Sequence, residues 1–223
     1  MKVRKISLVV IGIGMLLLSS ICVSANTLTE GTGDVYHWTQ TGTTWGWQYN
    51  VGDKPNIDIT GLSATIAGDQ LTLVLTVQGT IQDSDKIGYW AYYNTTDMTY
   101  WIVWANGEGS AFGFNASGGT YEGYNIGEIV VSGGTITGTF NITGATTEEN
   151  LYGYASEYTT SSGDTANEWW GDWIPNDNSP YKDTSGTDNT DNNGGSGSKS
   201  PGFEIPLVIT ALVIALIMIR RKK

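Results

Sequence analysis

Between residues 26 and 181, apolar and polar residues alternate in short runs, with the period of two that is typical of β-strands. In Gln70–Gln78 every second residue is leucine or valine, and the preceding Gly68-Asp69 is a typical hairpin turn. Comparable runs recur roughly every 10 to 15 residues, separated by glycine, asparagine and aspartate. The predicted strands are Ile57–Ile66, Gln70–Gln78, Ile87–Tyr93, Met98–Ala105, Glu108–Phe114, Thr120–Ile126, Glu128–Ser132, Thr135–Thr143, Leu151–Tyr158 and Glu168–Ile174.

This pattern predicts one all-β domain over residues 26–181. A chain of about 155 residues is long enough for a hydrophobic core, and its strands must bury one face of each sheet. We therefore expect an antiparallel two-sheet β-sandwich, either immunoglobulin-like or jelly-roll, with a closed barrel as the alternative. In Thr135–Thr143 the apolar residues lie opposite threonines, so Asn141 should face solvent.

The first 25 residues are typical of a signal peptide. Three basic residues precede an apolar run, which ends in the small residues Val23-Ser24-Ala25. We predict an N-terminal signal helix over residues 1–25, cleaved between Ala25 and Asn26. The alternative is an uncleaved N-terminal helix.

The C-terminal end predicts a membrane anchor. Ile205–Ile219 is apolar without interruption and is followed directly by Arg220-Arg221-Lys222-Lys223. A basic tail stays in the cytoplasm, so the chain from residue 26 to about 200 should face outward. Residues 182–200 are rich in Asn, Asp, Gly and Ser and predict a disordered stalk between the domain and this transmembrane helix.

Pro201-Gly202-Phe203 stands immediately before the anchor. The tripeptide, the apolar helix and the basic cluster together resemble the PGF-CTERM sorting signal of archaeal surface proteins, over residues 201–223. The resemblance implies that an archaeosortase-like processing enzyme removes the helix and joins the new C-terminus to a membrane lipid. The alternative is an ordinary C-terminal anchor. Either way, we expect the protein at the cell surface, held on the outer face of the cytoplasmic membrane.

The net charge of residues 26 to about 200, the part expected to face outward, limits which kinds of partner the protein can bind. Four lysines oppose 21 of the 22 acidic residues there, which gives a net charge of about −17. Nucleic acid is therefore not expected as a partner, because phosphate binding needs a basic patch. Such a charge favours solubility on a crowded or salty surface, and cation binding.

The residue types exclude several kinds of enzyme. After signal cleavage the chain has one histidine, His37, and no cysteine, which excludes Cys-His catalysis and His-rich or Cys-rich zinc sites. A Ser-His-Asp triad would need His37, and no Gly-x-Ser-x-Gly elbow is present. A glycosidase with two carboxylates stays open on residue types alone. We do not expect an enzyme.

All nine tryptophans and all 12 tyrosines lie in the exposed part. In the middle strands they occupy both alternating sets, so one set can fill the core while the other must be covered or exposed. An exposed row of rings suits stacking on sugars. The candidate glycan-binding residues are Trp90, Tyr92, Trp101 and Trp104. The alternative is that these rings all pack in the core or under loops.

Polar motifs add two further expectations. Asn94, Asn115 and Asn141 each begin an N-glycosylation sequon, and each falls in a predicted turn or on a polar strand face. We expect no cofactor, with calcium as the possible exception, because surface β-sandwiches use carboxylates to hold this ion. The candidate metal ligands are Asp34, Asp53, Asp58, Asp83 and Asp85.

The segment that begins at Pro55, the aromatic middle strands and the closing run Trp169-Trp-Gly-Asp-Trp-Ile-Pro form a second pattern. They resemble archaeal surface β-sandwich domains related to family 9 carbohydrate-binding modules and DOMON domains, over most of residues 31–181. The resemblance implies binding of a sugar, or sometimes of haem. Haem is not expected, because the usual axial donors are limited to His37 and Met98.

Together these features predict a surface-anchored extracellular binding module that recognises carbohydrate through exposed aromatic side chains. The alternative is a structural or adhesive cell-surface protein whose aromatic residues serve only the core.

Overall fold

The computed structural model describes residues 23–42, 44–48, 52–115, 123–160, 167–176 and 195–197, which form strands and turns. The strands are β1 (Val23–Thr29), β2 (Tyr36–Thr41), β3 (Thr44–Gln48), β4 (Ile59–Ala67), β5 (Gln70–Val77), β6 (Ile87–Asn94), β7 (Met98–Ala105), β8 (Glu108–Asn115), β9 (Gly123–Ser132), β10 (Thr135–Asn141), β11 (Asn150–Tyr158), β12 (Glu168–Ile174) and β13 (Gly195–Gly197). The prediction of an all-β antiparallel domain is confirmed.

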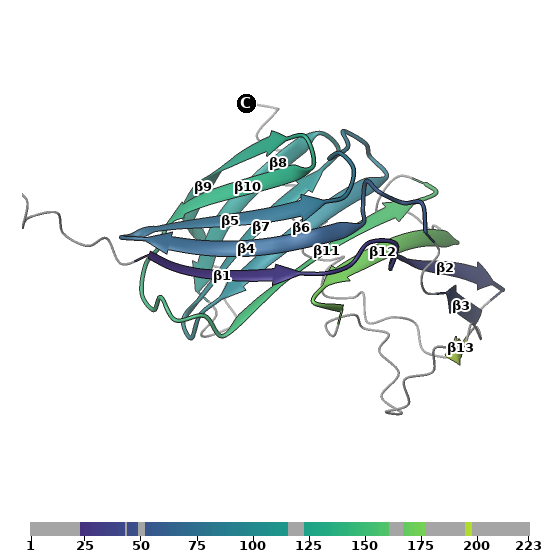
Figure 1. The fold of residues 1–223 in the computed structure, drawn as a ribbon, viewed down its shortest axis with the longest axis horizontal. Helices are drawn as coiled ribbons and strands as arrows, with labels where there is room; N and C mark the ends of the chain where they lie inside the picture. The colour runs from purple at the N-terminus through teal and green to yellow at the C-terminus, as the bar shows by residue number, and fades with distance from the viewer. Residues whose placement is uncertain are drawn as a thin grey trace, which may run out of the picture.

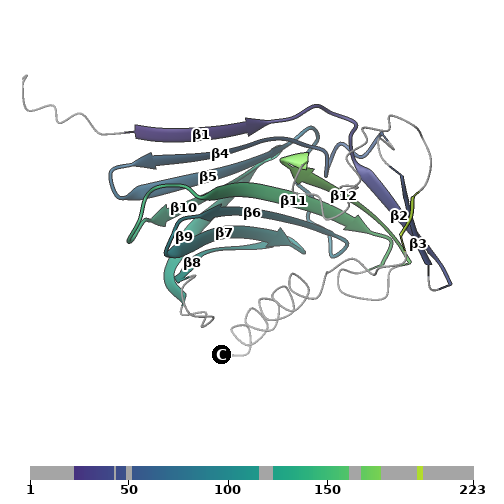
Figure 2. The same ribbon diagram turned by 90° about the horizontal axis from the view of Figure 1, so that it is seen from below.

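The strands form one continuous antiparallel sheet that curls back on itself (Figures 1 and 2). Their order is β1-β4-β5-β10-β9-β8-β7-β6-β11-β12-β2-β3-β13. Strand β9 pairs with β10 on one side and with β8 on the other, so it joins the two layers into one sheet. The prediction of two separate sheets is therefore not confirmed, although the layers do pack face to face, as β4 does on β11 and β12.

The core fills the space between the two layers. One layer supplies an aliphatic surface, in which Leu71, Leu73 and Leu75 alternate with threonine and valine along β5. The other supplies Tyr89, Tyr93 and further residues of β6, β7 and β11. Every second side chain of a strand points to the same face of the sheet, so each strand contributes one row of apolar side chains to this space. Burial of these rows is the main favourable term in folding.

Buried tyrosines at the ends of the core form hydrogen bonds with the backbone of neighbouring loops. The Tyr89 hydroxyl accepts a hydrogen bond from the Gln82 amide at 3.0 Å and donates one to the Asn56 carbonyl at 2.9 Å. Tyr100 makes the same two-way contact with the backbone of Thr143, at 2.8 and 3.0 Å. Burial raises the pKa of Tyr89 to about 12, so this hydroxyl keeps its proton at physiological pH.

The strand predictions differ from the structure at both ends of the chain and at one glycine. Strands β1, β2 and β3 were not predicted, because their runs are short and interrupted by polar residues, and in β3 also by a glycine. The predicted break between Ile126 and Glu128 is wrong, since β9 continues through Gly127. A Cβ atom at position 127 would lie 2.5 Å from the Thr139 carbonyl oxygen, so glycine permits a close approach to β10.

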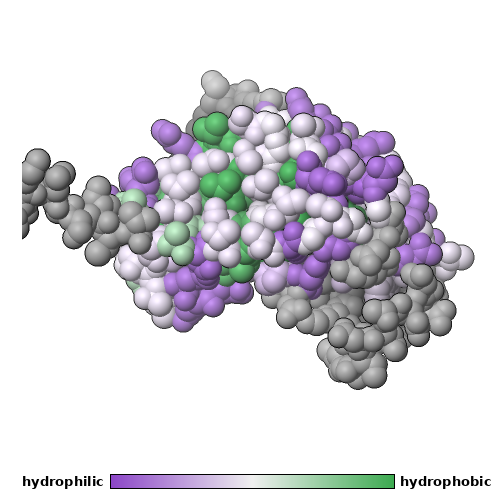
Figure 3. All heavy atoms as spheres, in the orientation of Figure 1, coloured by the Kyte–Doolittle hydropathy of each residue, from purple (hydrophilic) through white to green (hydrophobic). Residues whose placement is uncertain are grey.

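The outer surface of β4, β5 and β10 is largely polar. Thr65 pairs with Thr72, and Thr139 pairs with Thr72 from the other side, so threonines form rows across these strands. Figure 3 shows mainly hydrophilic and intermediate residues over this side, with a few apolar ones. Asn141 at the end of β10 is exposed, as its place in the alternation predicts.

Over the described residues, the structure contains no helix with the length and apolar character to cross a membrane. The predicted transmembrane helix, the sorting motif Pro201-Gly202-Phe203 and most of the signal segment lie outside those residues. The predicted cleavage site between Ala25 and Asn26 falls inside β1. Cleavage there would leave β1 paired with β4 from Asn26↔Ala64 to Thr29↔Gly61.

The closest approach between the two layers gives a test of this packing. A Cβ atom at Gly138 of β10 would lie 2.1 Å from Ile102 Cγ2 of β7. We expect Gly138→Ala to lower the free energy of unfolding by about 1–3 kcal/mol, because overpacking forces neighbouring side chains to shift. Denaturant unfolding of the full chain measures this. Gly46→Ala is the control, since its Cβ would lie 3.9 Å from its nearest neighbour, and equal losses in both variants would contradict the packing described.

Candidate functional site

Aromatic side chains cover the face of β6, β7, β11 and β12 that points away from the core, and the neighbouring strands β2, β3 and β8 add further rings to it. Along β6, Trp90 and Tyr92 alternate with the core residues Tyr89 and Tyr93. Cross-strand pairing continues this row, because Tyr92 lies opposite Trp101 of β7 on one side and Tyr152 of β11 on the other. We call this the outer aromatic face; its rings belong to Tyr36, Trp38, Trp47, Trp90, Tyr92, Trp101, Phe112, Phe114, Tyr152, Tyr154, Tyr158, Trp169 and Trp173.

Neighbouring rings on this face stack on one another across the strands. The Tyr92 and Tyr152 ring centroids lie 4.6 Å apart with the rings 9° from parallel, and Trp90 stacks on Tyr154 at the same distance. Further along, Trp38 and Trp169 stack at 4.0 Å. Such contacts add about 0.5–1.5 kcal/mol per pair beyond simple burial. The faces of these rings are therefore in contact with neighbouring rings.

The structure brings three of the four predicted glycan-binding residues together. Trp90, Tyr92 and Trp101 lie on the outer aromatic face, with Trp90 at 5% and Trp101 at 6% exposure. Trp104 does not belong to it: its ring packs against the core, and its Nε1 donates a hydrogen bond to the Gln82 carbonyl at 3.2 Å. Trp104 lies three residues after Trp101, and residues that are an odd number of positions apart point to opposite faces of a strand.

The indole N–H of Trp101 is a buried donor that has no hydrogen-bond partner. Buried polar groups in proteins nearly always have a partner, because leaving one unpaired costs about 1–3 kcal/mol. On the same face, the amide oxygen of Asn94 is also buried and unpaired. The outer aromatic face therefore contains one buried donor and one buried acceptor that lack a hydrogen-bond partner.

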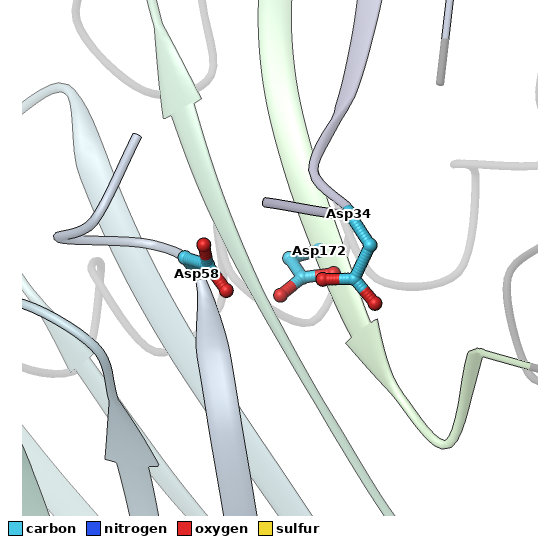
Figure 4. A group of neighbouring side chains, drawn as sticks. All are labelled: Asp34, Asp58 and Asp172. Carbon is cyan, nitrogen blue, oxygen red and sulfur yellow. The ribbon is translucent and has the colours of Figure 1, made fainter. Parts of the chain in front are cut away.

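A second unusual feature is a group of three carboxyl groups at one side of the core, which we call the three-aspartate cluster. Asp34 lies shortly before β2, Asp58 directly before β4, and Asp172 within β12. Each offers one oxygen, and these oxygens all lie within 4.8 Å of one another. Figure 4 shows Asp34 and Asp172 together, with the Asp58 carboxyl group directed at them. Their exposures are 9%, 1% and 0%.

Backbone amides hold two of these carboxylates in place. Asp172 accepts hydrogen bonds from the amides of Ile59 at 2.6 Å and Trp173 at 3.0 Å. Asp58 accepts one from the Gly33 amide at 2.6 Å. Gly33 has a φ of +81°, a value that suits glycine, and this turn brings Asp34 up to the cluster.

Two further residues border the cluster. Asn176, just after β12, donates from Nδ2 to Asp34 Oδ2 at 2.8 Å. Glu30, just after β1, is close enough for the three aspartates to act on its carboxyl group. Oxygen atoms that are buried without a hydrogen-bond partner remain on four of the five residues: both carboxyl oxygens of Glu30, Asp34 Oδ1, Asp58 Oδ1 and Asn176 Oδ1.

Burial and mutual repulsion make negative charge costly in this cluster. Burial, and then the charges of Asp172, Asp34 and Asp58, raise the pKa of Glu30 to about 9. Burial and the neighbouring aspartates likewise raise the pKa of Asp172 to about 8 and increase that of Asp58. The nearby cation Lys54 is paired with Glu157 at 2.7 Å instead. A proton or a metal cation must therefore balance these charges.

Of the predicted metal ligands, Asp34 and Asp58 lie in the cluster, whereas Asp53, Asp83 and Asp85 lie outside it. Sequence reasoning missed Asp172, Glu30 and Asn176. Asp172 did carry a signal, because it occupies a core-facing position of β12 between Trp170 and Ile174, where a charge is unusual. Its partners lie more than 100 residues away, at the other end of the domain, so their proximity is not visible in the sequence.

The three sequons lie at strand ends. Asn94 ends β6, Asn115 ends β8 and Asn141 ends β10. Asn141 is exposed, whereas Asn94 has a buried amide oxygen. Accessibility therefore favours Asn141 as the residue to carry a glycan, and glycosylation itself stays a prediction.

Comparison of the chain with family models, curated proteins and solved structures gave no match. The two resemblances to archaeal surface proteins accordingly stay predictions. The outer aromatic face and the three-aspartate cluster have to be interpreted from their own chemistry.

The raised pKa values predict how pH affects the metal-free protein. In the folded chain, burial raises the pKa of Glu30 from its ordinary 4.5 to about 9 and that of Asp172 from 3.8 to about 8. The folded state thus holds protons that the unfolded chain releases at lower pH, so the contribution of these two groups to stability is fully present below about pH 4 and is lost as the pH rises to about 9. Thermal unfolding in excess chelator at pH 5, 7 and 9 measures this. Glu30→Gln should flatten the fall, and a melting temperature that rises with pH would contradict the prediction.

Proposed function

We propose that this protein is a surface-anchored extracellular binding module that recognises carbohydrate on its outer aromatic face. The observation that carries the proposal is the gathering of rings on the side of the sheet that faces away from the core. A strand needs only one apolar face to fold, so this second apolar row serves something other than the core.

The chemistry of the face suits a sugar. Sugar rings present apolar C–H groups beside hydroxyls, and they bind where aromatic side chains lie next to a few well-placed polar groups. The Trp101 indole N–H and the Asn94 amide oxygen supply an unpaired donor and an unpaired acceptor for hydroxyl groups. Because the rings stack on each other, a ligand would lie across their edges and against the rings at the ends of the row.

The placement of the protein follows from its terminal segments. Export by a signal peptide and retention by a PGF-type C-terminal signal, with either a transmembrane helix or a lipid after archaeosortase-like processing, hold the domain on the outer side of the membrane. The acidic character of the domain disfavours nucleic acid as a partner. In this proposal the curled sheet is a variant of an immunoglobulin-like or jelly-roll sandwich, and Asn141 is the favoured glycosylation site.

A second function is favoured by one observation. Trp90 and Trp101 are almost completely buried, and the rings of the face are stacked on one another. A packed aromatic layer of this kind stabilises a domain that lacks disulfides, as a structural or adhesive surface protein requires. The two functions differ in whether the outer aromatic face contributes to affinity or only to stability.

Two tryptophans of β7 provide a matched test. Trp101→Phe removes the unpaired indole N–H of the outer aromatic face and keeps a ring, whereas Trp104→Phe removes the N–H that bonds to Gln82 on the core side. The full chain in mild detergent is screened on a glycan array, and the best glycan is then titrated. We expect Trp101→Phe to weaken binding about tenfold with little change in melting temperature, and Trp104→Phe to lower the melting temperature while affinity is kept.

A folded protein that binds no glycan on the array would contradict carbohydrate recognition. Equal loss of melting temperature in both variants, without any change in affinity, would likewise favour the structural function. The comparison is informative because both substitutions remove the same group from the same strand.

A further inference from the structure

We propose that the three-aspartate cluster, together with Glu30 and Asn176, is a binding site for a calcium ion that joins the two layers of the curled sheet. This inference is independent of carbohydrate binding, because the cluster lies on the core side of β12 and the outer aromatic face lies on the other side.

The spacing of the oxygens fits one ion. Calcium is bound by oxygen ligands at 2.3–2.6 Å, so two ligands of the same ion lie at most about 5 Å apart. The donor oxygens of Asp34, Asp58 and Asp172 all lie within 4.8 Å of one another. All three can therefore contact a single ion at their centre.

The unpaired oxygens point independently to a ligand. Asp58 is 1% exposed and Asp34 is 9% exposed, and in each of them one carboxyl oxygen is buried without a hydrogen-bond partner. The second oxygen of each is already used, by the Gly33 amide and by Asn176 respectively. This arrangement is typical of metal sites. There, a hydrogen bond to one carboxylate oxygen orients the group, and the other oxygen binds the ion.

The set of donors favours calcium among the common metals. Every candidate ligand is an oxygen: three aspartates, Glu30 and the Asn176 amide oxygen. Zinc prefers nitrogen and sulfur, and magnesium keeps several waters and uses only one or two carboxylates. Four carboxyl groups and an amide oxygen supply most of the six to eight oxygen ligands of calcium, and water can supply the others.

The position of the site explains what the ion does for the fold. Glu30 and Asp34 lie in the link from β1 to β2, Asp58 lies directly before β4, and Asp172 lies in β12. Strands β4 and β12 belong to opposite layers and face each other there, and the Ile59 amide already reaches across to Asp172. An ion at the centre of the cluster would bind segments from both layers at once.

The first experiment measures stability with and without the ion. The full chain in mild detergent is treated with chelator, and its melting temperature is then followed as CaCl₂ is added up to about 10 mM, since extracellular calcium modules have a Kd of about 0.1–1 mM. We expect a rise of about 5–10 °C at a hundredfold excess over Kd, and a much smaller rise with MgCl₂. Calorimetric titration should show one ion bound.

Two matched variants locate the site. In Asp58→Asn the amide oxygen can still accept the Gly33 hydrogen bond, while the other oxygen becomes an NH₂ group that cannot bind a cation. We expect this variant to lose at least tenfold in calcium affinity and to melt at a higher temperature than the wild type in chelator, because one repelling charge is gone. Asp53→Asn removes a charge outside the cluster and should keep the full calcium response.

The proposal would be overturned by a wild-type melting temperature that does not respond to 10 mM calcium and shows no binding by calorimetry. It would also be overturned if Asp53→Asn and Asp58→Asn reduced the response equally, because the ion would then bind to the diffuse negative charge of the surface. The gain in stability of Asp58→Asn without metal shows that the variant folds, so a lost calcium response cannot be attributed to unfolding.

Discussion

The Asp172 carboxylate is the interaction on which the closure of this fold depends. The sheet curls through β9, so its two layers are joined by a backbone ladder on one side only. On the other side, where β4 faces β12, the Asp172 carboxylate accepts the Ile59 amide from the opposite layer. A carboxyl group that is 0% exposed is costly to bury, and what it contributes is to fix how the two layers meet. Close to that junction, the Gly33 amide donates a hydrogen bond to the Asp58 carboxylate and so ties the turn at Gly33 to the start of β4.

The strict alternation of β-strands accounts for both apolar faces of the second layer. Residues such as Tyr89 and Ile102 point inward and fill the core, and the residues between them point outward and form the outer aromatic face. The first layer, in contrast, turns leucines inward and threonines outward. Both layers thus turn an apolar face to the core. Their outer faces differ, since one is polar and the other aromatic, so a ligand that binds aromatic rings has only one side of the described domain to bind.

The sequence predicted the strands of the middle of the domain well, because there the alternation is regular and glycine or asparagine marks the turns. It failed at β2 and β3, which are short, and at Gly127, where a glycine serves close packing and not a turn. The same limit applies to the site. Asp34 and Asp58 could be suspected from their residue type, but Asp172 becomes their neighbour only when the chain returns more than 100 residues later. Local periodicity predicts which face a side chain takes, and it carries no information on which distant segment will lie opposite.

The first strand in the sheet order has a consequence for aggregation. Among the residues that the structure describes, β1 pairs only with β4, so its other edge presents backbone groups to which a neighbouring chain can add a strand. If signal cleavage occurs after Ala25, it shortens this strand to Asn26–Thr29. A strand of that length is a poor template for joining molecules edge to edge. The same cut that releases the protein from the export machinery would then also protect it against aggregation.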